Sequence, residues 1–135
     1  MSATVNAPAK LTISLRVTGI RPDGFHLIDA EMVTLNLCDT LTITEAETSS
    51  LSVSGPFAEG VPIDSSNLCL AAAKFAQRPV SIRLEKNIPH GGGLGGGSAD
   101  AAAVLRWAGI SDVASTVTLG ADIPFCLHGG RARVT

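Results

Sequence analysis

Glycine fills half of one short segment of this chain, and the segment leads directly into an alanine-rich apolar run. Six of the twelve residues from 89 to 100 are glycine, and residues 101–105 behind them have the composition of a helix. Glycine lets backbone N–H groups approach a ligand closely, and the first turn of a helix presents N–H groups without partners. The segment therefore predicts a phosphate-binding loop. Ser98 would lie near the helix start, where its hydroxyl can reach a phosphate oxygen or a magnesium ion.

Other glycine-rich designs fit this segment less well. A Walker A loop ends in Gly-Lys-Ser or Gly-Lys-Thr, and no lysine stands beside Ser98. Gly91, Gly93 and Gly96 satisfy the G-x-G-x-x-G spacing of dinucleotide-binding loops. However, residues 80–85 in front of them alternate apolar and polar side chains, whereas the central strand of an NAD-binding fold is nearly all apolar. A flexible surface linker is the remaining alternative, although an apolar helix rarely follows a linker.

Lys10 and Asp122 are the charged residues with the pattern expected for phosphoryl transfer. Lys10 stands at the head of an alternating run, on the side opposite its apolar residues, and Asp122 lies in an otherwise apolar loop, where an unused carboxylate is costly. Brought together, the lysine would keep the aspartate ionised, and the aspartate would accept the proton of an acceptor hydroxyl. From spacing alone, a solvated lysine and a turn-capping aspartate remain open as alternatives.

The composition narrows the class of protein. A chain of 135 residues can form one domain with a core, and 45% apolar with 16% charged residues is typical of a globular protein. A net charge of −2, with four Phe, one Trp and no Tyr, argues against nucleic-acid binding. No run has the length of a membrane span or the pattern of a signal peptide. Cys38, Cys69 and Cys126 are scattered, which favours reduced thiols and predicts a cytoplasmic protein.

The periodicity of the chain predicts short strands followed by strands mixed with helices. Alternation over residues 11–17, 31–37, 41–44 and 51–54, with Asp39 as a break, predicts an antiparallel meander. Ser65–Asn67 offers a helix N-cap before an apolar stripe that ends near Gln77. We further expect a strand at 80–85, a helix from 101 to 108 and one or two strands between 125 and 135.

Four motifs occur together in one family. They are residues 7–11 around Lys10, 21–26 with the sequence Arg-Pro-Asp-Gly-Phe-His, 89–103 around the glycine segment, and 119–125 around Asp122. In order and approximate spacing they resemble the 4-diphosphocytidyl-2-C-methyl-D-erythritol kinases. That family belongs to the galactokinase, homoserine kinase, mevalonate kinase and phosphomevalonate kinase (GHMP) superfamily. The resemblance covers nearly the whole chain, and the Pro-Asp-Gly-aromatic-His motif narrows it to the cytidyl-substrate family.

The resemblance implies an activity, a set of roles and a fold. The activity is ATP-dependent phosphorylation of a hydroxyl of 4-diphosphocytidyl-2-C-methyl-D-erythritol in non-mevalonate isoprenoid synthesis, with ATP and Mg²⁺ as cofactors. Lys10 and Asp122 match the catalytic pair, with Asp122 as the base. The implied ATP-phosphate loop consists of Pro89, His90, Gly91, Gly92, Gly93, Leu94, Gly95, Gly96, Gly97, Ser98 and Ala99, with Ser98 nearest the metal. The implied fold is the α+β N-terminal domain of the superfamily, a mixed and mostly antiparallel sheet with packed helices.

The resemblance also implies a substrate site, in which this chain departs from the family pattern. Phe25 would stack on the cytosine and His26 would supply polar contacts, with Asp23 and Thr12 beside them. Thr12 stands where asparagine is usual, and Phe25 stands where tyrosine is common. The segment 107–119 is shorter than usual by about one or two helical turns.

The length of the chain leaves the activity open between two hypotheses. The family has a C-terminal domain of similar size, so we expect residues 1–135 to form a single N-terminal, ATP-binding domain without it. A homodimer or a separate chain carrying the C-terminal domain would complete the site. The alternative is a catalytically incomplete nucleotide-binding domain.

Overall fold

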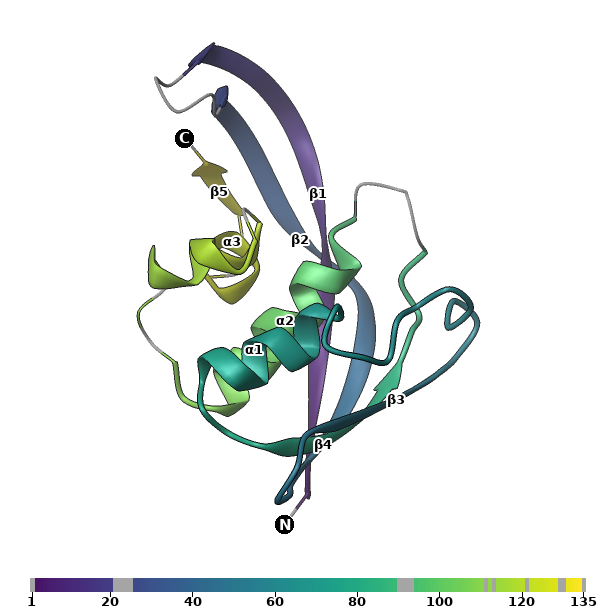
Figure 1. The fold of residues 1–135 in the computed structure, drawn as a ribbon. Helices are drawn as coiled ribbons and strands as arrows, with labels where there is room; N and C mark the ends of the chain where they lie inside the picture. Colours follow the sequence, from purple (N-terminus) through teal and green to yellow (C-terminus); the bar gives the residue numbers. More distant parts are fainter. Residues whose placement is uncertain are drawn as a thin grey trace.

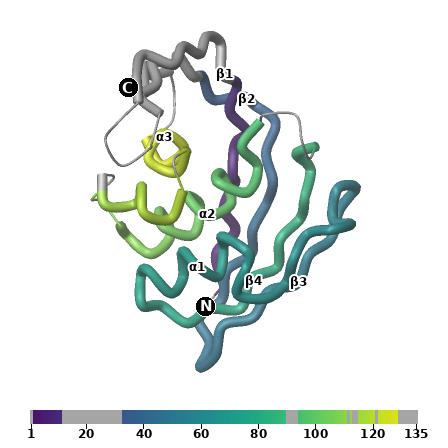
Figure 2. The backbone as a smooth tube through the Cα atoms, turned by 45° about the horizontal axis from the view of Figure 1, so that its top comes forward, coloured from purple at the N-terminus to yellow at the C-terminus, as the bar shows by residue number. Residues whose placement is uncertain are grey.

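In the part of the chain that the structure describes, one sheet of five strands carries three α-helices on one of its faces (Figure 1). The computed structural model describes residues 2–20, 26–89, 94–110, 112, 114–120, 122–128 and 131–134, and it describes side chains at these positions except 12–20, 26–32, 114 and 131–134. The backbone trace in Figure 2 shows α1, α2 and α3 on the same side of β1, β2, β4 and β3. The expected α+β class is confirmed.

Two long antiparallel strands form the spine of the sheet. β1 spans Ser2–Ile20 and β2 spans His26–Glu45, and their paired residues run from Ser2 with Thr44 to Ile20 with His26. The predicted break at Asp39 is wrong, because β2 continues through it. The Asp39 carboxylate is fully buried and accepts hydrogen bonds from the backbone of the segment after β4, so this polar side chain is satisfied inside a strand.

The smaller strands do not form the predicted meander. β3, Ser50–Ser54, pairs in parallel with β4, Val80–Glu85, and the strand order is β1-β2-β4-β3. The chain therefore leaves β3, passes through a helix and returns to insert β4 between β2 and β3. The crossover is α1, Leu68–Phe75, and such a helix is the usual connection between parallel strands. The alternation predicted for 80–85 is confirmed, since Val80, Ile82 and Leu84 are buried.

Helix α2 is the centre of the core. It spans Gly96–Trp107, and every residue from Ala99 to Leu105 is buried. Small alanine side chains let the helix lie close to β1, α1 and α3, which surround it. The expected N-cap of α1 is confirmed, because the Asn67 side chain accepts a hydrogen bond of 2.8 Å from the Cys69 amide. No helix within the described residues has the length and hydropathy required to cross a membrane.

The C-terminal part of the described chain differs from the strand prediction. After a short 3₁₀ turn, η1 at Ala114–Thr118, residues Ile123–His128 form helix α3, and only Arg131–Val134 form a strand, β5. β5 pairs antiparallel with β2. β5 confirms one of the one or two strands predicted between 125 and 135, whereas residues 125–128 form a helix, because a short apolar run does not distinguish a buried helix from a strand by periodicity alone. Within α3, the side chains of Ile123 and Phe125 are buried.

Candidate active site

The structure brings Lys10 and Asp122 together from opposite ends of the chain. Lys10 Nζ lies 3.4 Å from Asp122 Oδ2, with the lysine side chain 9% exposed and the aspartate 37% exposed. The strand pairing is irregular between Pro8 and Lys10, and an irregularity of this kind redirects a side chain. The orientation differs from the predicted pattern, since Leu11 is 44% exposed and Lys10 is buried.

The start of α2 packs directly on Lys10. The Lys10 amide donates a hydrogen bond of 2.8 Å to the Leu94 carbonyl, which ties the glycine segment to β1. Gly95 has a φ of 66°, and a Cβ atom there would lie 2.8 Å from Lys10 Cε. A larger residue at position 95 would therefore be strained and would also displace the lysine. Glycine at position 95 therefore allows the turn into α2 and leaves room for the Lys10 side chain.

A second lysine lies under the glycine segment, between two buried carboxylates. Lys86 Nζ donates to Asp39 Oδ2 at 2.5 Å and to Asp100 Oδ2 at 2.7 Å. All three side chains are 5% exposed or less. Asp39 Oδ1 also accepts from the amides of Asn87 and Ile88, at 2.6 and 2.9 Å. We call Asp39, Lys86 and Asp100 the buried triad, and it joins β2, the segment after β4 and the first turns of α2.

Asp100 and Lys86 both have raised pKa values. Burial raises the pKa of Asp100 to about 8, with Asp39 adding to the rise and Lys86 opposing it. Burial acts to lower the pKa of Lys86, but the attraction of Asp100 and Asp39 outweighs it and leaves that pKa raised. Asp100 Oδ1 is buried and has no hydrogen-bond partner in the described structure. Buried polar atoms are rarely left without a partner, so this oxygen is a candidate contact for a ligand or a water molecule.

A cavity of about 250 Å³ opens beside the triad, at the adjoining starts of α1 and α2. It is lined by Gly60, Val61, Pro62, Ser66, Asn67, Leu68, Lys86, Gly97 and Asp100. A Cβ atom on Gly97 would meet nothing closer than Leu68 Cδ1, at 3.9 Å. The first amides of α2 and this cavity are therefore adjacent, so a ligand could contact the helix start and the cavity at once.

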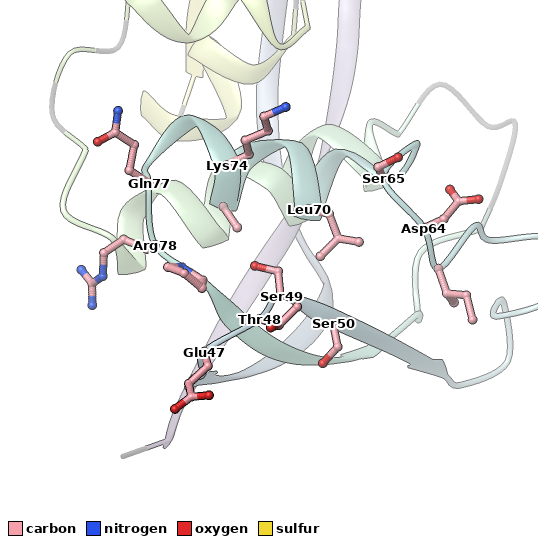
Figure 3. A pocket seen from close by; sticks show the side chains of 13 residues that line it. Glu47, Thr48, Ser49, Ser50, Asp64, Ser65, Leu70, Lys74, Gln77 and Arg78 are labelled. Carbon is pink, nitrogen blue, oxygen red and sulfur yellow. The ribbon is translucent and has the colours of Figure 1, made fainter.

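A larger cavity, of about 680 Å³, runs along α1, from the residues before the helix to those after it (Figure 3). Leu70 and Ser49 lie on its inner side, whereas the charged ends of Lys74, Arg78 and Glu47 point away from them in Figure 3. Part of this arrangement has a structural role, since Arg78 pairs with Glu45 and stacks over the Trp107 ring.

The predicted site residues are covered unequally by the structure. Lys10, Asp122, Pro89, Leu94, Gly95, Gly96, Gly97, Ser98 and Ala99 are described, and those from 96 to 99 form the first turn of α2. His90, Gly91, Gly92, Gly93, Asp23 and Phe25 lie outside the described residues. For Thr12 and His26 only the backbone is described, in β1 and β2. The buried triad was missed by the sequence reasoning, although single charged residues in apolar stretches are a signal for it.

The sequence of this chain is similar to known kinases. The N-terminal domain of the GHMP kinases matches residues 67–130. The chain is 53% identical over 128 residues to the 4-diphosphocytidyl-2-C-methyl-D-erythritol kinase of Paracoccus denitrificans (strain Pd 1222), covering 95% of this chain and 46% of that relative. It is 48% identical over 134 residues to the kinase of the same name from Jannaschia sp. (strain CCS1), covering 95% and 49%. The chain thus spans about half the length of the curated relatives it matches.

Solved structures agree with the sequence comparison. A crystal structure of 4-(cytidine 5'-diphospho)-2C-methyl-D-erythritol kinase superimposes with a TM-score of 0.72 at 36% identity, covering 98% of this chain and 52% of that one. Mevalonate pyrophosphate decarboxylase from Streptococcus pyogenes shares the fold, with a TM-score of 0.69 at 14% identity. The matched domain and the solved kinase structure at 36% identity together show that the chain carries a GHMP-kinase N-terminal domain.

Proposed function

We propose that this chain takes part in the ATP-dependent phosphorylation of a hydroxyl of 4-diphosphocytidyl-2-C-methyl-D-erythritol. The observation that carries the proposal is the Lys10–Asp122 pair, 3.4 Å apart and packed against the glycine start of α2. A base for the acceptor hydroxyl, a cation beside it and a helix start for phosphate are the parts that phosphoryl transfer needs. The names of the relatives supply the substrate.

The described residues fit ATP at the start of α2. The amides of Gly96, Gly97 and Ser98 lie in the first turn, where they have no intrahelical acceptor, and phosphate oxygens would bind there. The nucleoside would occupy the cavity of about 250 Å³, where the Asp100 carboxyl, whose Oδ1 has no partner among the described residues, could form a hydrogen bond with the base. ATP with Mg²⁺ would supply the phosphoryl group and neutralise its charge, and Ser98 is the proposed contact for the metal.

Lys10 and Asp122 would divide the remaining chemistry between them. Asp122, the more exposed member, would accept the proton of the attacking hydroxyl. Lys10 would offset the negative charge that develops on the transferred group. Phe25, His26, Asp23 and Thr12 remain the proposed contacts for the cytidine and methylerythritol parts of the substrate.

A second candidate function is nucleotide binding without catalysis. It is supported by the start of α2 and the cavity beside it, which could bind a nucleotide without any reaction at the Lys10–Asp122 pair. On this view residues 1–135 act as an ATP-binding domain. The two candidates share the ATP site and differ in turnover.

The experiment that tests the proposal is ADP release by the purified chain. Release is measured with Mg-ATP in the presence and absence of 4-diphosphocytidyl-2-C-methyl-D-erythritol, beside Asp122→Asn. Substrate-dependent release that falls by about a hundredfold or more in the variant supports the kinase, since the base contributes about that much. Full turnover in Asp122→Asn would refute its role as the base. ATP binding without release would leave the second candidate.

A further inference from the structure

Arg106, near the end of α2, joins the two elements that carry the Lys10–Asp122 pair. Its Nη1 donates to the Cys126 carbonyl of α3 at 3.0 Å, and its Nη2 donates to the Asn6 carbonyl of β1 at 3.2 Å. β1 is an edge strand, and Cys126 lies in the last turn of α3, whose carbonyls lack intrahelical donors. The guanidinium fork therefore satisfies a carbonyl on each element at the same time.

These contacts close a ring around the pair. Asn6 precedes Lys10 by four residues on β1, and Asp122 precedes Cys126 by four residues at the start of α3. The Cys126 amide donates to the Asp122 carbonyl at 3.1 Å, so the turn that carries the carboxylate is fixed to the residue that Arg106 holds. The fourth side of the ring is the contact between Lys10 Nζ and Asp122 Oδ2.

The Arg106 side chain is exposed to solvent, but it also lines a cavity next to the Lys10–Asp122 pair. Arg106, Asn6, Lys10 and Cys126 line one cavity of about 310 Å³ between β1, α2 and α3. Burial lowers the pKa of the guanidinium, and a partly desolvated cation forms stronger hydrogen bonds to carbonyls than one in water. Burial, followed by the charge of Asp122, raises the pKa of the Cys126 thiol to about 11, so this thiol is protonated at neutral pH and does not compete for the cation.

We propose that Arg106 is a positioning residue that sets the distance between Lys10 Nζ and Asp122 Oδ2 by holding α3 against the edge of β1. The catalytic consequence of this proposal rests on the proposed function, in which Lys10 and Asp122 carry out the reaction. The geometric claim itself concerns only where the two side chains lie. Arg106 touches neither reacting group, and it acts through the backbone of α3 and β1.

The test measures the pair directly and needs no turnover. A water-soluble carbodiimide activates the Asp122 carboxyl, the Lys10 amine attacks it, and an amide forms as one water is transferred to the carbodiimide. The yield of the Lys10–Asp122 cross-link is measured by proteolysis and mass spectrometry. Asp122→Asn removes the product and identifies the peptide. Because amide formation requires the reacting atoms within about 3.5 Å of each other, Arg106→Met is expected to lower the yield at least about threefold.

Two further variants keep the test decisive. Arg106→Lys retains the charge but has one nitrogen, which reaches only one of the two carbonyls, so we expect an intermediate cross-link yield. This variant keeps the proposal testable if Arg106→Met does not fold. Arg78→Met is the matched control, because Arg78 also bridges elements but pairs with Glu45 and stacks on Trp107. A cross-link yield equal to wild type in both folded Arg106 variants overturns the proposal, as does an equal loss in Arg78→Met.

Measuring kcat and KM in Arg106→Met distinguishes a failure of this inference from a failure of the proposed function. If the chain turns over, Arg106→Met is expected to lower kcat about tenfold or more while the KM values stay within about twofold, because only the alignment of the pair is lost. A rise in KM with an unchanged kcat overturns the positioning role. If wild type itself does not turn over, the proposed function fails, and the cross-link yields still decide whether Arg106 sets the pair.

Discussion

At the scale of single residues, the least expected feature is the buried triad beneath the glycine segment. Asp39 and Asp100 share one ammonium group, so full ionisation would leave one uncompensated negative charge inside the protein. Among the described residues, Asp39 accepts hydrogen bonds from three donors, whereas Asp100 accepts one from Lys86 and its second oxygen has no donor. The proton of the group therefore belongs on Asp100, which agrees with the direction of its pKa.

The stability of the fold should depend on this proton. The pKa of Asp100 is about 8 in the folded chain against a reference of 3.8, so folding takes up a proton between roughly pH 4 and pH 8. The free energy of unfolding should therefore fall as the pH rises through this window, and the contribution of Asp100 should be constant below it. Asp100→Asn removes this titration, and we expect it to reduce the fall by more than about 1 kcal/mol.

The measurement is urea unfolding at pH values across the window, in the wild type and in Asp100→Asn. Asp112→Asn is the matched control, since it makes the same chemical change at an exposed carboxylate. Its profile should follow that of the wild type. Identical pH slopes in Asp100→Asn and the wild type would show that another group takes up the proton.

At the scale of elements, the sequence predicted those whose local signals agree with their packing. The α1 cap at Asn67 and the alternation of β4 are local, and both are confirmed. The continuity of β2 depends on the amides of Asn87 and Ile88, which lie far along the chain and satisfy Asp39. The parallel pairing of β3 with β4 likewise depends on the crossover through α1. Tertiary contacts, rather than propensity, decided these features.

The site was predictable to the same extent. Lys10 and Asp122 could be singled out because each is a charged residue in an apolar motif, and the structure brings them together. The contacts of Arg106 could not be found this way, because it binds backbone carbonyls, which leave no mark on the sequence. Its place in the last turn of α2 resembles that of any cation which complements a helix dipole.

The turn into α2 allows a prediction about how closely that element fits Lys10. Gly95→Ala places a methyl group 2.8 Å from Lys10 Cε and also requires a positive φ, at 66°. We expect a loss of about 2 kcal/mol or more in unfolding free energy, of which about 1–2 kcal/mol is the backbone term. We also expect a lower yield of the Lys10–Asp122 cross-link, because the lysine must move away from the new methyl group.

Gly109→Ala separates the two causes. Gly109 has a φ of 79°, and a Cβ atom there would have nothing within 4 Å. This variant should lose only the backbone term and keep the cross-link yield of the wild type. Chemical denaturation and cross-linking of both variants provide the comparison. Equal losses of stability with unchanged cross-linking would mean that Lys10 adapts freely to a side chain at position 95.

At the scale of the whole molecule, the candidate site lies where an edge strand meets the helical layer. β1 contributes Lys10, α2 contributes the glycine start and Arg106, and the residue before α3 contributes Asp122. The buried triad fixes the start of α2 to β2 and to the segment after β4. The ATP site proposed here is therefore built from elements within the described fold, so nucleotide binding can be tested apart from turnover.

Binding of Mg-ATP should raise the melting temperature of the chain. At a free concentration ten times Kd, a ligand that binds only the folded state adds about 1.4 kcal/mol, which shifts the midpoint of a domain of this size by several degrees. Gly97→Val should abolish the shift without lowering the melting temperature of the free chain. Its Cβ has room, 3.9 Å from Leu68 Cδ1, but its branched side chain would enter the cavity proposed for the nucleoside.

NAD with Mg²⁺ is the control for a dinucleotide site and should leave the melting temperature of the wild type unchanged. An ATP shift that persists in Gly97→Val would place the nucleoside elsewhere. A shift lost in Gly97→Val but retained in Asp122→Asn would separate nucleotide binding from the chemistry of the Lys10–Asp122 pair.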